Sequence, residues 1–184
     1  MAIANAEVPL GTPAPDFALR DVRTGTLVRK TDFAGKPLLV IFMCNHCPYV
    51  KHVETKLVEV ANRLQEEGIG VVAISANDPE AYPDDAPERL GMAFPYLFDE
   101  TQEVAKSYRA ATTPDLFLYD RDHKLFYRGR FDAARPKQPT PVTGEDLLNA
   151  VERLRKGEAP PEPQYPSVGC SIKWKPGNQP DYYG

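Results

Sequence analysis

PLLVIFMCNHCPYV, residues 37–50, joins an apolar run to a pair of cysteines. The run Leu38–Met43 has no polar residue and ends abruptly at Cys44-Asn45-His46-Cys47. An apolar run this short predicts a strand buried on both faces, as in a parallel or mixed sheet covered by helices. Because the residues that follow repeat with a helical period, the two cysteines lie where a core strand passes into a helix.

A thiol at the start of a helix has unusual chemistry. The first N–H groups of a helix lack partners and its dipole is positive there, so the pKa of a nearby thiol falls. Two intervening residues let the sulfurs meet across one turn, so Cys44 can attack a disulfide and Cys47 can resolve the mixed disulfide. We expect Asn45 to cap the helix, because its side chain can accept from an orphan N–H. Pro48 suits the first turn, where a missing N–H costs little.

Length and composition limit the classes of protein. A chain of 184 residues with 42% apolar and 26% charged residues is typical of one soluble domain. The net charge of −4 argues against nucleic acid as a partner. The beginning, MAIANAEVPLGTPAPDF, lacks the pattern of a signal peptide, and no apolar run approaches the ~20 residues that span a bilayer. We therefore expect a cytoplasmic protein without a membrane partner.

The cysteines favour redox chemistry over metal binding. Three cysteines are too few for a disulfide scaffold, so a Cys-x-x-Cys pair in a cytoplasmic chain indicates a redox or metal site. Zinc needs four ligands, and only Cys170, His52 and His123 remain to join the pair, so no metal is expected. Haem attachment needs a histidine where Pro48 stands.

The other patterns predict alternating strands and helices. Apolar residues at helical spacing after the cysteines predict a helix that ends at Gly68, and GVVAIS at 70–75 predicts a strand parallel to the first. Two short strands are expected at 16–20 and 26–30. The later predicted elements are a loop at 76–86, helices at 87–92, 100–108 and 143–156, an extended piece at 94–98, and a hairpin of strands at 115–119 and 125–128.

Residues 157–184 have a different composition. They hold six of the nineteen prolines, together with Trp174, Tyr182, Tyr183 and Cys170. A plain linker would not need those aromatic residues, so we expect an extended tail packed on the domain.

The order of motifs through residues 37–156 resembles the thioredoxin fold. The segment FPYLFDETQEVAKSYRAATTPDLFLYD at 94–120 resembles the AhpC/TSA-like branch, which includes peroxiredoxins and TlpA/ResA-type thiol-disulfide reductases. CNHCPYV together with GCSIKWKPGN resembles a group of bacterial proteins of this superfamily. The resemblance implies an α/β fold with a central mixed sheet flanked by helices and an N-terminal β-hairpin extension. Residues 1–156 would form the thioredoxin-like domain, and 157–184 the tail.

The resemblance also implies roles for particular residues. Cys44 would be the nucleophile and Cys47 the resolving cysteine. Thr113-Pro114 would face them with Pro114 cis, leaving the backbone of Thr113 free to pair with a substrate strand.

The motif departs from that of thioredoxins in three ways. Met43 replaces the usual tryptophan, the dipeptide is Asn45-His46, and the strand 38–43 has no carboxylate to deprotonate the resolving cysteine. His46 instead resembles the histidine of disulfide-forming oxidoreductases. An imidazole there can stabilise the Cys44 thiolate and raise the potential above the value of about −270 mV for thioredoxin.

Three alternatives stay open. A peroxiredoxin-like peroxidase needs a threonine three residues before its cysteine and an arginine; Ile41 precedes Cys44 at that spacing, whereas Arg128 and Arg130 are available. A thioredoxin-fold module for metal binding or partner docking is the second. Cys170 is the third open point, since it is either an inert buried thiol or part of a three-thiol relay.

The prediction is a thiol-disulfide oxidoreductase, monomeric or a weak homodimer, without a metal or organic cofactor. Its partners would be protein or small-molecule disulfides, and a cellular dithiol reductant would reset the Cys44–Cys47 pair.

Overall fold

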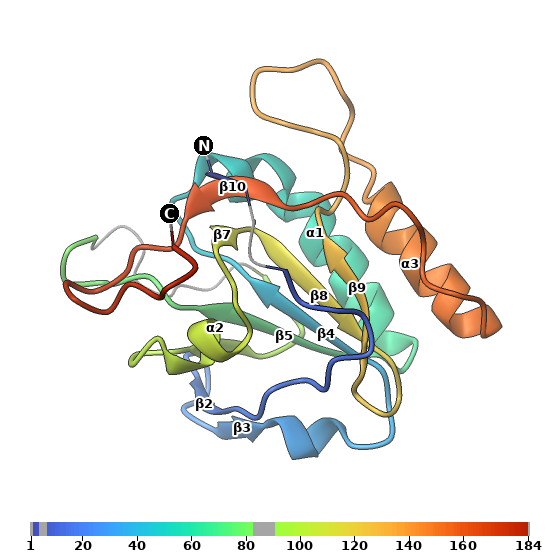
Figure 1. Ribbon diagram of the computed structural model, residues 1–184, viewed down its shortest axis with the longest axis horizontal. Helices are drawn as coiled ribbons and strands as arrows, with labels where there is room; N and C mark the ends of the chain where they lie inside the picture. The colour runs from blue at the N-terminus through green and yellow to red at the C-terminus, as the bar shows by residue number, and fades with distance from the viewer. Residues whose placement is uncertain (1, 4–6, 83–90, 184) are drawn as a thin grey trace.

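A mixed sheet of seven strands forms the centre of the computed structural model, which describes residues 2–3, 7–82 and 91–183 (Figure 1). The strand order is β3-β2-β6-β5-β4-β8-β9. β4 lies in the middle, parallel to β5 and antiparallel to β8. The strands are β2 (Ala18–Asp21), β3 (Leu27–Arg29), β4 (Leu38–Phe42), β5 (Gly70–Ser75), β6 (Tyr96–Phe98), β8 (Asp115–Tyr119) and β9 (Leu125–Gly129).

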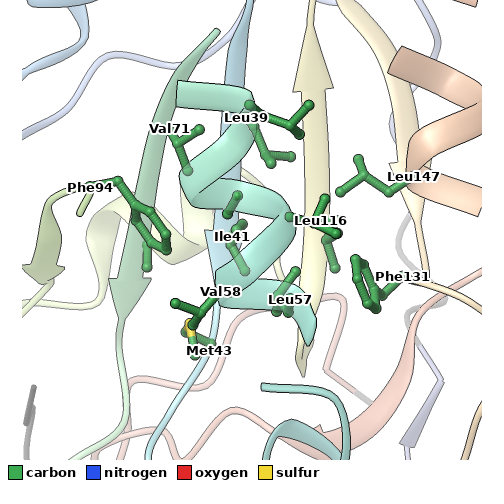
Figure 2. Packing of buried hydrophobic residues seen from close by; sticks show 14 of the residues in the cluster. Leu39, Ile41, Met43, Leu57, Val58, Val71, Phe94, Leu116, Phe131 and Leu147 are labelled. Atoms are coloured by element: carbon green, nitrogen blue, oxygen red, sulfur yellow. The ribbon is translucent and has the colours of Figure 1, made fainter. Parts of the chain in front are cut away.

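Helices cover both faces of this sheet. α1 (Pro48–Glu66) and α3 (Glu145–Lys156) pack on one face, where Leu39 and Ile41 of β4 meet Leu57 of α1 (Figure 2). The alternate residues of β4 point to the opposite face, as strand geometry requires. That face is covered by the short α2 (Glu103–Ser107), the N-terminal arm and part of the tail. All five residues of β4 are buried, which confirms the strand predicted to be buried on both sides.

Most predicted elements are present with small shifts at their ends. The parallel β4–β5 pair and the β8–β9 hairpin are confirmed. The helix predicted at 100–108 starts only at Glu103, because Gln102 has a φ of 65°. The helix predicted from 143 starts at Glu145, after Gly144 at its N-cap with a φ of 72°. The predicted helix at 87–92 and the end of the loop at 76–86 fall largely outside the described residues.

The tail contains a strand that the prolines concealed. β10 (Val168–Ser171) lies between β1 (Ala2–Ile3) and β7 (Thr112–Thr113) in a second sheet and contacts α1 (Figure 1). Among the described residues, none of the helices is both long and apolar enough to cross a membrane.

Candidate active site at the start of helix α1

The residue that caps α1 is Cys47. Pro48 occupies the first helical position, and Lys51 donates its N–H to the carbonyl of Cys47 at 2.9 Å. The prediction that Asn45 caps the helix is therefore wrong. Residues 43–47 connect β4 to the helix without helical structure, so the helix starts two residues later than that cap would require. The second cysteine, and not the first, therefore lies at the N-terminal end of α1, where the helix dipole is positive.

Thr113 and Pro114 face the cysteines, and the bond between them is cis, as the resemblance implied. Cys47 Sγ donates to the carbonyl of Thr113 at 3.3 Å, and Cys44 Sγ lies 3.4 Å from the hydroxyl of that threonine. Cys44 and Cys47 are only 1% and 4% exposed. Both sulfurs and the cis-proline loop therefore form one enclosed site.

The thiol of Cys47 is acidic. A hydrogen bond from the Cys44 thiol is the largest influence, and it lowers the pKa of Cys47 to about 5 against the opposing effect of burial. A hydrogen bond from the thiol of Cys170 and the nearby N–H of Val50 lower this pKa further. The carbonyl of Thr113 accepts only from the protonated form, so that contact is lost on ionisation.

The two residues between the cysteines have different environments. Asn45 is half-buried and accepts a hydrogen bond from the Tyr96 hydroxyl at 3.1 Å, which ties the loop to β6. His46 is exposed. A role for His46 in tuning the pKa of a cysteine stays a prediction.

Cys170 belongs to the same group of thiols. It lies on β10 opposite Thr113, is partly exposed, and packs against the buried cluster that contains Cys44 and Cys47. Burial raises the pKa of Cys170 to about 12, and the adjacent Cys47 sulfur raises it as well. The signal for this strand was present in the sequence, because Val168, Cys170, Ile172 and Trp174 alternate with polar or small residues.

The two candidate arginines form ion pairs, and His123 contacts the backbone. Arg128 pairs with Asp115 at 3.1 Å, and Arg130 pairs with Asp146 at 2.6 Å. His123 hydrogen-bonds backbone carbonyls at the far end of the β8–β9 hairpin. Within the described parts of the chain, no three His, Cys, Asp or Glu side chains are grouped to hold a metal ion.

The acidity of Cys47 predicts a distinctive titration. We expect thiolate absorbance in the ultraviolet to persist from neutral pH down to about pH 5, where the Cys47 thiolate takes up its proton. Because this folded-state pKa lies below the ordinary value of 9.0, stability gained from the thiolate is complete above pH 9 and is lost as pH falls towards 5. Cys47→Ser is the control. Absorbance that disappears near pH 9 in the wild type would contradict the prediction.

The sheet order, the cysteine pair at the start of α1 and the facing cis-proline define a thioredoxin-like fold. The same fold is present in the thioredoxin domain of a thiol-disulfide oxidoreductase from Bacteroides vulgatus, with a TM-score of 0.58 at 22% identity over 80% of this chain and 98% of that one. The family model for AhpC/TSA matches residues 10–128, and the chain belongs to the AhpC/TSA family.

The chain is also similar to two uncharacterised proteins of known structure and to a thiol-disulfide oxidoreductase of known sequence. A conserved uncharacterized protein from Geobacillus kaustophilus has 50% identity and a TM-score of 0.88 over 92% of this chain and 94% of that one. A hypothetical protein from Sinorhizobium meliloti has 44% identity and a TM-score of 0.89 over 94% and 98%. The thiol-disulfide oxidoreductase ResA of Geobacillus thermodenitrificans is 29% identical over 118 residues, which are 64% of this chain and 67% of that protein.

Proposed function

We propose that this protein is a thiol-disulfide oxidoreductase in which Cys47 is the attacking cysteine. The observation that carries the proposal is the position of Cys47 at the N-cap of α1, beside Thr113 and the cis Pro114. The similarity to the oxidoreductase ResA supports the same class of activity. The sequence pattern assigned attack to Cys44, but the helix terminus that stabilises a thiolate is at Cys47.

The proposed reaction is disulfide exchange in two steps. The Cys47 thiolate attacks one sulfur of a substrate disulfide, a mixed disulfide forms, and the other substrate sulfur leaves as a thiolate. Cys44, which hydrogen-bonds the Cys47 sulfur, then attacks that sulfur. The second substrate thiol is released, and a Cys44–Cys47 disulfide remains. A dithiol reductant in a reducing compartment such as the cytoplasm would restore both thiols.

A peroxidase is a weaker candidate for this site. If Cys47 attacks, the residue three positions earlier is Cys44 and not the threonine that peroxiredoxins need. Arg128 pairs with the buried Asp115 and donates to the carbonyl of Arg109. Disulfide exchange needs only the two adjacent thiols. Peroxide activation needs a threonine three residues before the attacking cysteine and an arginine that holds the peroxide, and the threonine is absent from that position.

The reduction potential of the Cys44–Cys47 pair tests the proposal. We expect the Cys170→Ser variant, equilibrated with glutathione, to show one two-electron couple assigned by mass mapping to these two cysteines. A His46→Ala variant should shift its potential if the imidazole tunes it. Absence of a couple, combined with rapid consumption of hydrogen peroxide, would replace the proposal with a peroxidase. Absence of a couple with stoichiometric bound metal, lost in Cys47→Ser, would indicate a metal-binding module.

A further inference from the structure

The C-terminal strand occupies the backbone edge beside the cis-proline. β10 runs antiparallel to β7, with Cys170 opposite Thr113 and Ser171 opposite Thr112 (Figure 1). The expectation that the backbone of Thr113 is free for a substrate strand is therefore wrong, because the protein's own strand already pairs with it. An added strand of this kind is the way in which sheet edges bind extended peptides.

Contacts on both sides of β10 hold it in this position. The Ser167 hydroxyl donates to Asp115 at 2.8 Å, and the Ile172 N–H donates to the carbonyl of Ala111 at 3.0 Å. Further along, the Lys173 N–H donates to the Asn77 side chain at 2.9 Å. The strand is thus fixed before and after Cys170, and the thiol is presented at a defined place.

The approach of the two strands depends on the residue before Cys170. A Cβ atom added to Gly169 would lie 2.0 Å from the carbonyl oxygen of Thr113, closer than real contacts allow. Only glycine lets the backbone come this near without displacing β7. The sequence Gly-Cys in this strand thereby brings a thiol against the cis-proline loop.

Cys170 and the sulfur that the proposed function makes reactive both lie against Thr113. Cys47 Sγ donates to the carbonyl of Thr113 at 3.3 Å, and Cys170 pairs with the same residue across the β7–β10 ladder. Cys170 also packs against the buried cluster that contains Cys44 and Cys47, and its thiol helps to lower the pKa of Cys47. Cys170 occupies the position that a cysteine in a bound substrate strand would take relative to Thr113.

We propose that Cys170 is a third redox thiol. It replaces Cys44 as the disulfide partner of Cys47, so that the oxidised protein contains a Cys47–Cys170 disulfide. The inference rests on the proposed function, because it needs Cys47 to be the reactive cysteine. In the exchange, the Cys170 sulfur attacks Cys47 Sγ, the Cys44–Cys47 bond breaks, and Cys44 leaves as a thiolate that takes up the proton lost by Cys170. No electrons enter or leave the protein in this step.

The charge on Cys47 adds to burial in raising the pKa of Cys170 and so lowers the reactivity of this thiol. While Cys47 is a thiolate, its negative charge disfavours a second thiolate beside it, and Cys170 stays protonated as a hydrogen-bond donor. A disulfide at Cys47 carries no charge, so this repulsion disappears when the first disulfide forms. Cys170 therefore becomes a better nucleophile only after Cys47 has been oxidised.

Oxidised glutathione with the full-length chain tests the inference. In Cys44→Ser, we expect Cys47 to take up glutathione and then release it completely as the Cys47–Cys170 disulfide forms, identified by mass mapping after acid quenching and alkylation. In Cys44→Ser/Cys170→Ser, glutathione should remain on Cys47 in a one-to-one mixed disulfide. Retention of glutathione by the single variant, equal to that of the double variant, would overturn the inference.

A matched control separates position from mere proximity in sequence. Ser171→Cys in the double variant places a thiol on the next residue of β10, whose side chain points to the opposite face of the strand. Glutathione should then remain on Cys47; release as rapid as with Cys170 would overturn the inference. Circular dichroism of the reduced variants checks that each is folded.

The proposed function and this inference fail in different ways. If Cys170→Ser forms no Cys44–Cys47 disulfide, the proposed function fails. If that variant forms the disulfide but Cys44→Ser keeps its glutathione, only the role of Cys170 fails.

Discussion

Cys47→Ser is expected to lower disulfide-reductase activity by on the order of a thousandfold or more, because it removes the proposed nucleophile. Its hydroxyl cannot ionise near neutral pH, so the stabilisation offered by the helix terminus and by the Cys44 hydrogen bond is not used. Reduction of insulin with dithiothreitol as reductant measures this loss. Cys44→Ser should keep the first chemical step, since Cys47 remains.

The order of attack can be read from single-turnover products. With oxidised glutathione, Cys44→Ser/Cys170→Ser should form a mixed disulfide at Cys47 in a few minutes, whereas Cys47→Ser/Cys170→Ser should leave Cys44 almost unmodified. These variants differ only in which of the paired cysteines is kept. If Cys44 forms the mixed disulfide and Cys47 does not, the assignment made from the sequence pattern is restored.

The main framework of the fold could be predicted from local patterns. The apolar run of β4, the helical period of α1 and the GVVAIS strand each express their structure within a short stretch of sequence. The start of α1 could not be fixed in the same way. Cys44, Asn45, His46 and Cys47 are all compatible with a position just before a helix, and a shift of two residues decides which of them lies at the helix terminus.

For the tail, the sequence pattern indicated a strand, but it did not indicate which strand it pairs with. Alternation from Val168 to Trp174 indicates a strand, yet the surrounding prolines suggest an extended coil. Its pairing with β7 joins residues more than fifty positions apart, and no local pattern encodes such a contact. The position of Cys170 beside the Cys44–Cys47 site therefore became visible only from the structure.

The ion pair below the cis-proline was equally hidden. Asp115 follows Pro114 directly, is completely buried, and accepts from Arg128 at 3.1 Å and from Ser167 at 2.8 Å. Sequence alone offered Arg128 as a ligand for peroxide. In the structure the Arg128 charge instead compensates the buried carboxylate of Asp115, which follows the cis-proline. The Ser167 hydroxyl connects the same carboxylate to the tail.

Arg128→Ala is expected to lower the free energy of unfolding by about 3–5 kcal/mol, because it leaves the buried Asp115 carboxylate without its counter-charge. Burial already raises the pKa of Asp115, and the Arg128 charge opposes that rise. In the variant this pKa rises further, so protonation removes the unpaired charge at mildly acidic pH. The loss of stability, measured by urea denaturation, should therefore be larger at neutral than at acidic pH.

Two further variants separate the ion pair from other contacts of Arg128. This side chain also stacks over Phe117 at 4.7 Å and donates to the carbonyl of Arg109, so its truncation removes packing as well as charge. Asp115→Asn in the Arg128→Ala background should recover part of the lost stability at neutral pH, since the amide carries no charge to leave unpaired. Lys56→Ala, which breaks an exposed pair with Glu59, should cost less than about 1 kcal/mol.

A loss in Arg128→Ala that is as small as this control and independent of pH would show that Asp115 is accommodated without its partner. The structural link from the cis-proline loop through Asp115 and Ser167 to β10 would then not depend on that charge.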